Sequence, residues 1–350
     1  MQAAGELSDI VSRYFDIAEE QQIGENVYRY KVIGAKEGDL RKSFRALYAD
    51  LVKRGYAPAL RRASESLYLV VAKFSTRTNW LAWSVLAIAT IIMVYISGEA
   101  LTSSPGGGPL TPVLYTVGLL APLIVHESGH WLTMRHYGVP RSPPYLIPAP
   151  PLQFGFLGTL GAVINMKWVP VDSDELALIG VMGPLAGFLA ALPVAIIGLR
   201  TSQLVPATSV TAPAFPLVPV IMDLLLAASH TPSGYVVVMS PLALSGLIVF
   251  LVTFLNLIPI GQLDGGHVIR AALGERGHMV VSAVFVLLLL VLGLYYPYLG
   301  FFGVIALILL LITRGRHPGP ALEGSRLTAK GYVAVVIYGL LLALTMPLPA

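Results

Sequence analysis

The chain has 350 residues, of which 55% are hydrophobic and only 12% are charged, and its mean hydropathy is +0.74. This charged share is about half of what is usual in a soluble protein, so the composition predicts a polytopic α-helical membrane protein. The formal net charge of +4 is spread without a run of like charges, which argues against a nucleic-acid partner, and the lack of cysteine excludes disulfides and thiolate metal ligands.

The charged residues concentrate at the N-terminal end of the chain. Residues 1–76 contain 12 of the 23 Lys and Arg residues and 10 of the 19 Asp and Glu residues. We therefore predict a polar N-terminal module, residues 1–76, followed by a transmembrane domain, residues 77–350. Because the first apolar run begins only near Trp80, no signal peptide is evident, and the module is expected to remain cytoplasmic.

The N-terminal module has the pattern of a small α/β fold. The sequence predicts a polar helix near residues 7–20, a strand over 27–33 and a helix over 38–54 with one apolar face. Two further strands are predicted over residues 56–61 and 66–72. No cluster of metal ligands or nucleophiles occurs in this part of the sequence, so its role is left open.

Seven apolar runs follow the module. They cover residues 80–97, 111–134, 176–199, 240–260, 279–294, 299–313 and 331–346. Some of these runs are short for a bilayer, which needs about 20 helical residues to be crossed. If all seven cross the membrane, every Lys and Arg in the connecting loops except Arg200 lies on the same side as the N-terminus. We therefore predict about seven transmembrane helices in the cell membrane, with the N-terminus in the cytoplasm.

One apolar stretch between the runs does not fit a spanning helix. It combines several prolines with Gly155, Gly158 and Gly161, which excludes a stable helix. Unpaired backbone in lipid is costly, so such a segment must be buried in protein or line a cavity. A re-entrant hairpin beside the active site, within this stretch at residues 145–168, satisfies this requirement. The alternative is that these glycines only let helices pack closely.

A glutamate flanked by two histidines lies inside the second apolar run, in the sequence His126-Glu127-Ser128-Gly129-His130. On a helix, residues i and i+4 share one face, so both imidazoles can bind one zinc ion while Glu127 reaches a metal-bound water. Ionisable groups so deep in an apolar segment are costly and indicate function. The alternative, two core histidines bonded to carbonyl groups, does not explain the carboxylate between them.

A catalytic zinc ion usually has three protein ligands, so the two histidines need a companion. Asp264 ends another apolar run, in the sequence Asn-Leu-Ile-Pro-Ile-Gly-Gln-Leu-Asp-Gly-Gly-His at residues 256–267. The predicted topology places Asp264 at a depth similar to that of His126. A lone Asp beside glycines is otherwise typical of a turn. Since the metal site needs an oxygen or nitrogen donor, we predict that Asp264 is the third ligand.

These two motifs together resemble the site-2 protease family of intramembrane zinc metalloproteases. The similarity rests on His-Glu-x-x-His at 126–130 and Asn-x-x-Pro-x-x-x-Leu-Asp-Gly at 256–265, and it covers roughly residues 111–275. The resemblance implies a catalytic core there, one bound Zn²⁺ and a re-entrant, membrane-inserted β-hairpin, which we place at residues 152–166. It also implies regulated intramembrane proteolysis, in which a single-span membrane protein is cleaved in or near its transmembrane segment.

The residues suggest a route for that reaction. Zinc lowers the pKa of its bound water from about 15.7 towards 7, and Glu127 can accept the proton as a general base. Asn256 is a candidate for stabilising the oxyanion, although a buried Asn can equally cap backbone groups. An unwound substrate can pair with the hairpin by strand addition, where Gly155, Gly158 and Gly161 permit close approach.

Other functions remain open at this point. A non-proteolytic zinc transporter or sensor would use the two histidines and Asp264 but has no need for Glu127. An enzyme acting on a lipid would use the same metal site. The substrate and the oligomeric state are not determined by the sequence, and the active site is expected within the membrane, towards the cytoplasmic side.

The remaining histidines have less informative surroundings. His136, His230, His278 and His317 lie near the ends of apolar runs, and we expect them at the membrane interface. His267 follows Asp264 closely and is a candidate for a hydrogen bond that supports the metal ligands.

Overall fold

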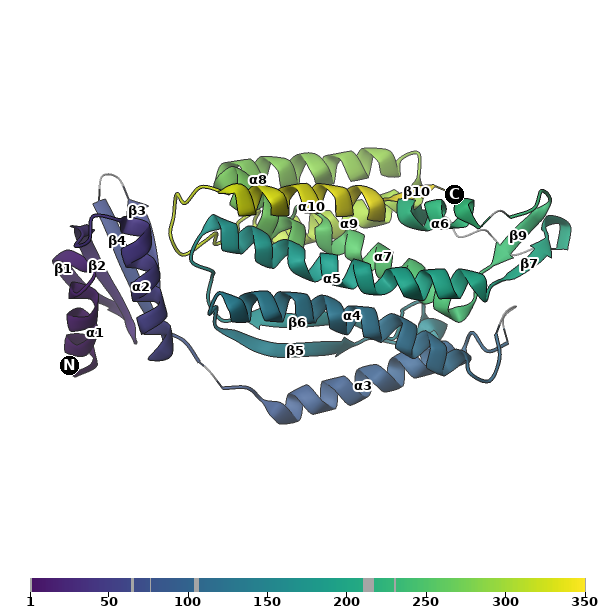
Figure 1. Cartoon of the computed structure of the whole chain (residues 1–350), viewed down its shortest axis with the longest axis horizontal. Helices are drawn as coiled ribbons and strands as arrows, with labels where there is room; N and C mark the ends of the chain where they lie inside the picture. Colours follow the sequence, from purple (N-terminus) through teal and green to yellow (C-terminus); the bar gives the residue numbers. More distant parts are fainter. Residues whose placement is uncertain are drawn as a thin grey trace.

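The structure, a computed structural model, describes residues 2–63, 66–75, 77–103, 107–209, 217–229 and 231–349. Within these residues, a small N-terminal α/β unit is followed by a bundle of long apolar helices (Figure 1). The first long helix, α3 (Trp80–Glu99), lies at the edge of the bundle (Figure 1).

The N-terminal unit is a four-stranded antiparallel sheet with two helices. Its elements are α1 (Gln2–Ser12), β1 (Phe15–Gly24), β2 (Val27–Ala35), α2 (Leu40–Lys53), β3 (Tyr56–Ala63) and β4 (Ser66–Lys73), and the strand order is β1-β2-β4-β3. Asp39 caps α2 by accepting hydrogen bonds from the backbone N–H groups of Arg41 and Lys42. Phe44, Leu47 and Leu51 repeat on one face of α2 and are fully buried against the sheet.

The first predicted helix of this unit was wrong in its second half. Residues 15–24 form strand β1 and not the end of a helix, because they pair with β2 as the outer strand of the sheet. A tight turn at Glu25 and Asn26, where Asn26 has a positive φ of 59°, reverses the chain between the two strands. Sheet pairing here overrides the helix preference of a segment rich in Glu and Gln.

A helix occupies each of the seven predicted apolar runs. These helices are α3 (Trp80–Glu99), α4 (Thr111–His136), α5 (Ser173–Arg200), α7 (Pro241–Leu257), α8 (Asp264–Gly293), α9 (Pro297–Thr313) and α10 (Ala329–Thr345). Within the described residues, α3, α5 and α8 are long and apolar enough to cross a membrane, and α7, α9 and α10 are apolar helices of 17 residues. The predominantly helical, apolar architecture is compatible with a membrane protein.

Helix α8 begins earlier than its apolar run predicts. It starts at Asp264, and Gly274 interrupts it with non-helical dihedral angles (φ 73°, ψ −171°), so α8 consists of two consecutive helices. The short first part carries the Asp-Gly-Gly-His sequence. Helix α5 runs through the middle of the bundle and contacts α4, α7, α8 and α10 (Figure 1).

The smaller elements lie between these helices. They are β5 (Arg141–Pro148), η1 (Leu152–Phe154), β6 (Thr159–Met166), β7 (Gln203–Pro206), η2 (Ala207–Ser209), β8 (Leu217–Pro219), α6 (Val220–Ala228), β9 (Tyr235–Val238) and β10 (Pro347–Pro349). Strands β5 and β6 form an antiparallel hairpin. The predicted position of the hairpin, residues 152–166, was therefore wrong at its start. The first strand, β5, ends before residue 152, and the residues between β5 and β6 form the loop of the hairpin.

The N-terminal unit shares a hydrophobic core with the polar end of the bundle. Val171, Ala321 and Leu322 are buried in the same cluster as the residues of α2 and the sheet. The backbone N–H of Leu60 donates to the carbonyl oxygen of Ala321 over 2.8 Å, and the Tyr48 hydroxyl donates to the carbonyl oxygen of Val169 over 3.0 Å. The unit is therefore docked on the segments that precede α5 and α10.

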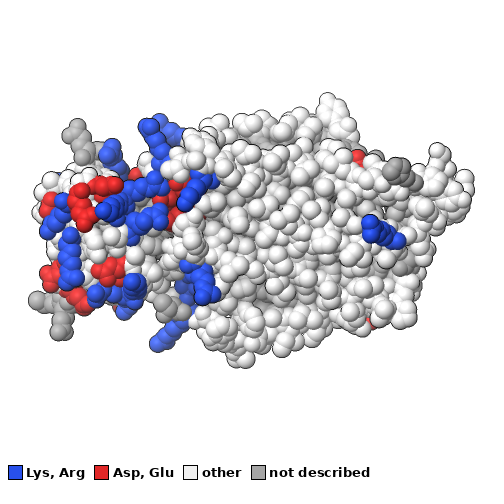
Figure 2. Space-filling view, viewed as in Figure 1, with Lys and Arg blue, Asp and Glu red and all other residues white. Residues whose placement is uncertain are grey.

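Charged residues mark the same division of the molecule. In Figure 2, Lys, Arg, Asp and Glu side chains cover the N-terminal unit and the adjoining end of the bundle, whereas the visible face of the remaining bundle is nearly free of charge. Large apolar side chains such as Leu81, Leu132 and Leu287 are exposed on the bundle helices. An uncharged band of this kind is typical of a surface that contacts lipid.

Candidate metal centre

Helix α4 supplies two of the three residues that meet at the centre. His126 and His130 are one helical turn apart, so their side chains leave the same face of α4. Both are buried, with 3% and 6% of their surface exposed. Glu127, between them in the sequence, is also buried.

Asp264 comes from the first turn of α8, 138 residues after His126. The two glycines that follow it are required by close backbone packing. A Cβ atom at Gly265 would collide with the carbonyl oxygen of Leu257, and one at Gly266 would collide with that of Gly261. The Asp-Gly-Gly sequence thus lets the chain fold back against the end of α7 and carry the carboxylate to α4.

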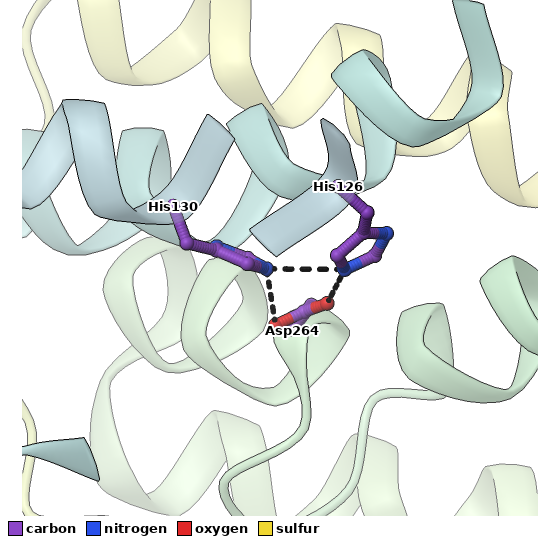
Figure 3. A group of neighbouring side chains, drawn as sticks. All are labelled: His126, His130 and Asp264. Carbon is purple, nitrogen blue, oxygen red and sulfur yellow. Dashed lines mark hydrogen bonds and ion pairs between the residues drawn. The ribbon is translucent and has the colours of Figure 1, made fainter. Parts of the chain in front are cut away.

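The three side chains converge as Figure 3 shows. Nε2 of His126 lies 3.2 Å from Oδ2 of Asp264, and Nε2 of His130 lies 3.3 Å from Oδ1. The two Nε2 atoms are 3.2 Å apart. Ligand atoms at about 2.0–2.1 Å from a tetrahedral zinc ion are separated from one another by about 3.3 Å. Each imidazole nitrogen has this spacing from the other and from one oxygen of the Asp264 carboxylate, so the three residues can hold one metal ion.

The orientation of His130 is set by α5. Nδ1 of His130 donates to the carbonyl oxygen of Ile179 over 2.7 Å, which leaves Nε2 without a proton and free to bind a metal. Helix α5 also provides the space for both imidazoles through two glycines. A Cβ atom at Gly183 would collide with the ring of His130, and one at Gly187 would lie 2.7 Å from Cβ of His126.

A cavity of about 200 Å³ opens beside the three donors. It is lined by Glu127, His130, Asp264, Asn256 of α7 and residues 162–164 of β6. Within the described part of the chain, the side-chain amide of Asn256 forms no hydrogen bond and caps no backbone group. Its amide is therefore available to a molecule that enters the cavity.

The three glycines predicted to contact a substrate have different surroundings. Gly155 ends η1 in the exposed connection between β5 and β6. A Cβ atom at Gly158 would lie 2.6 Å from the carbonyl oxygen of Met93, so this glycine lets the connection approach α3. Only Gly161, with a φ of 96°, lies within strand β6.

Two histidines that the sequence suggested at the membrane interface are buried. His278 is fully buried, and His317 is 4% exposed. Nε2 of His317 lies 2.7 Å from Nδ1 of His267. This contact joins residues 50 positions apart and follows from no local pattern, which is why the sequence did not predict it. His136 is exposed, and His230 lies outside the described residues.

Comparisons with known proteins agree with this geometry. The profile of peptidase family M50 matches residues 114–295, which is more than half of the chain and includes all three donors. The probable zinc metalloprotease EGY1, chloroplastic, of Oryza sativa subsp. japonica is 28% identical over 253 residues, which cover 68% of this chain and 42% of that protein.

Two proteins of Arabidopsis thaliana are similar as well. Its probable zinc metalloprotease EGY2, chloroplastic, is 27% identical over 64% of this chain and 39% of its own length. Its probable zinc metalloprotease EGY1, chloroplastic, is 31% identical over 47% of this chain and 30% of its own length. The chain thus spans about two fifths or less of these relatives. No solved structure matches the chain. From the profile match and the residues it contains, the chain belongs to peptidase family M50, the site-2 protease family.

Proposed function

We propose that this chain is an intramembrane zinc metalloprotease that hydrolyses a peptide bond in or near the transmembrane segment of single-span membrane proteins. His126, His130 and Asp264 would hold one Zn²⁺. The observation that carries the proposal is the convergence of three residues next to a buried glutamate. The two Nε2 atoms are 3.2 Å apart, and each lies 3.2 or 3.3 Å from a different oxygen of the Asp264 carboxylate. Membership of family M50 and the names of the similar proteins support the metal and the reaction class.

Glu127 is the general base of the proposed reaction. Zinc, when bound, supplies a Lewis acid that polarises the scissile carbonyl and makes water more acidic. Glu127 accepts a proton from the water that attacks the carbonyl carbon, and it then delivers a proton to the leaving nitrogen as the C–N bond breaks. Its burial beside the donors places the carboxylate in the water-poor setting that such proton transfer favours.

The substrate is proposed to bind along β6. This strand pairs only with β5 among the described elements, so its second edge has backbone groups available for another strand. Residues 162–164 of β6 line the cavity with Glu127. An unwound substrate added at this edge would bring its carbonyl groups to the donors. Gly161 permits close approach there, and Asn256 donates its amide N–H to the substrate carbonyl.

The arrangement in the membrane is part of the same proposal. The transmembrane domain, residues 77–350, would cross the cell membrane with seven helices and a re-entrant β5–β6 hairpin. The N-terminal module, residues 1–76, would lie in the cytoplasm. The clustering of charge over this module and the adjoining end of the bundle supports that orientation (Figure 2). The donors lie near this end, since Asp264 begins α8 and His130 is close to the end of α4.

The proposal is tested by substituting Glu127→Gln in the purified protein and measuring its zinc content and cleavage of single-span substrates. We expect the variant to keep its zinc and to lose cleavage by about 100-fold or more, because the general base is removed and the ligands are not. Equal cleavage by variant and parent would remove Glu127 from the reaction. A parent protein that binds zinc but cleaves no membrane substrate would favour a transporter or sensor.

A further inference from the structure

A third histidine, His267, is buried near the two histidines proposed as zinc ligands. His267 lies three residues after Asp264 on α8, so both side chains leave the same face of that helix. A Cβ atom added at Gly180 of α5 would lie 2.9 Å from Cβ of His267. The absence of a side chain at Gly180 therefore leaves room for His267 beside α5. Gly183 and Gly187 leave room for His130 and His126 in the same way.

Two successive hydrogen bonds determine where His267 carries its proton. The backbone N–H of Gly319 donates to Nδ1 of His317 over 2.9 Å, so that nitrogen has no proton. Burial lowers the pKa of His317 and keeps its ring neutral, and the single ring proton is then on Nε2. This Nε2–H donates to Nδ1 of His267 over 2.7 Å. The other nitrogen of His267, Nε2, is consequently protonated and is a hydrogen-bond donor.

The Nε2–H group of His267 has no protein partner in the described part of the chain. The one hydrogen bond of this side chain goes through Nδ1. His267 also lines the 200 Å³ cavity together with Glu127, His130 and Asp264. His267 is 8% exposed and lines this cavity, so its Nε2–H is available to an acceptor on a molecule that enters the cavity.

We infer that His267 is a catalytic hydrogen-bond donor whose Nε2–H binds the carbonyl oxygen of the scissile peptide and stabilises the negative charge that develops on it. His317 is a positioning residue, which acts only through His267 by fixing the position of its ring proton. This role rests on the proposed function, since the peptide carbonyl is the acceptor. Preorganised donors of this kind lower the barrier because they need no reorientation during the reaction.

The segment that carries His317 is held by the N-terminal unit. Arg61 of β3 donates to the carbonyl oxygens of Pro320 and Ala321 over 2.9 and 2.8 Å. His317 thus contacts α8 directly, and the segment that follows it is held by β3. The docked unit thereby supports the hydrogen bonds that orient His267.

Paired substitutions in the full-length, zinc-loaded protein test this role. His267→Leu removes the donor, and we expect kcat on a single-span substrate to fall roughly 100-fold with unchanged KM and zinc content. His267→Gln keeps an N–H near the same position and should retain activity within roughly tenfold of the parent. His317→Gln, which can still donate to Nδ1 of His267, should be more active than His317→Leu. Exposed His136→Gln is the control and should match the parent.

The proton position is measured independently of cleavage by ¹⁵N NMR of protein labelled at histidine. We expect the parent to show His267 protonated at Nε2 and bare at Nδ1, with the signal assigned by its loss in His267→Gln, and we expect this preference to weaken in His317→Leu. A His267 ring protonated at Nδ1 and bare at Nε2 would overturn the inference whatever the activity. Unchanged kcat in His267→Leu, with Glu127→Gln inactive, would overturn the catalytic role of His267 and leave the proposed protease intact.

Discussion

Two carboxylate sites lie at the starts of long helices, and they differ in what balances their charge. At the start of α5, Asp172 accepts ion pairs at 2.7 Å from both Arg41 and Arg45 of the N-terminal unit. At the start of α8, Asp264 faces the imidazoles of His126 and His130, and no Lys or Arg in the described residues forms an ion pair with it.

This difference separates a structural site from a reactive one. The protein itself supplies permanent cations to Asp172, so the first site joins the N-terminal unit to the bundle and is complete without a ligand. At Asp264, a carboxylate and two Nε2 atoms point at one another with the spacing of ligands around a single ion. The second site is completed by a cation from outside the chain.

Gly183→Ala should disturb only the second site. The added Cβ would collide with the ring of His130, so we expect a loss of zinc affinity of roughly 10–100-fold, the range typical when the support of a metal ligand is removed. Gly339→Ala on α10 is the control, because its added Cβ meets nothing within 4 Å. Zinc titration compares the two. Equal zinc affinity in both variants would show that α5 does not determine the position of His130.

The double substitution Arg41→Gln and Arg45→Gln should disturb only the first site. It leaves Asp172 buried without its cations, and we expect a loss of about 1–3 kcal/mol in the stability of the docked arrangement. The estimate is modest because the arginine side chains are 41% and 47% exposed. Thermal unfolding and limited proteolysis measure the effect, and zinc content should not change.

The exposed Lys42→Gln on the same helix is the control for this double variant. Its ion pair with Glu37 is 3.7 Å long and both side chains are well exposed, so its loss should cost less than about 0.5 kcal/mol. If the double variant is no less stable than this control, Asp172 does not depend on the arginines.

A smaller effect is expected from pH. Burial would raise the pKa of Asp172, but hydrogen bonds from the Arg41 side chain and the Glu175 backbone hold it below its usual value. A carboxyl group whose pKa is lower in the folded protein than in the unfolded chain stabilises the folded state at pH values above the unfolded pKa of about 4. This stabilisation is lost as the pH falls through the pKa of the folded state. Proteolysis between the N-terminal unit and α3 should therefore accelerate in acid, and Asp172→Asn should weaken that pH dependence. If proteolysis of Asp172→Asn accelerates in acid as much as that of the parent, the pH dependence arises from other titratable groups.

The bundle and the donor pair of α4 were predictable because their signals are local. The positions of the seven bundle helices follow from hydrophobicity, and the i, i+4 spacing places His126 and His130 on one face whatever the tertiary structure. Asp264 required a further step, because it was predicted only from the need of a catalytic zinc ion for a third ligand. The structure brings it to the histidines through the tight packing of Gly265 and Gly266.

Other features depend on contacts between elements, which the composition of a single segment does not show. Strand β1 forms because β2 lies beside it, although its residues favour a helix. The hairpin begins at Arg141, because prolines are tolerated in a strand with a free edge. The pairing of His317 with His267 and the docking of α2 on Asp172 arise only when the bundle has formed.

Zinc K-edge X-ray absorption of the purified protein, combined with its metal content, tests the central claim most directly. We expect one zinc ion per chain, with two imidazole nitrogens and a carboxylate oxygen at about 2.0–2.2 Å, and loss of the ion in Asp264→Ala. Full zinc occupancy in Asp264→Ala, or a spectrum without imidazole ligands, would contradict the account.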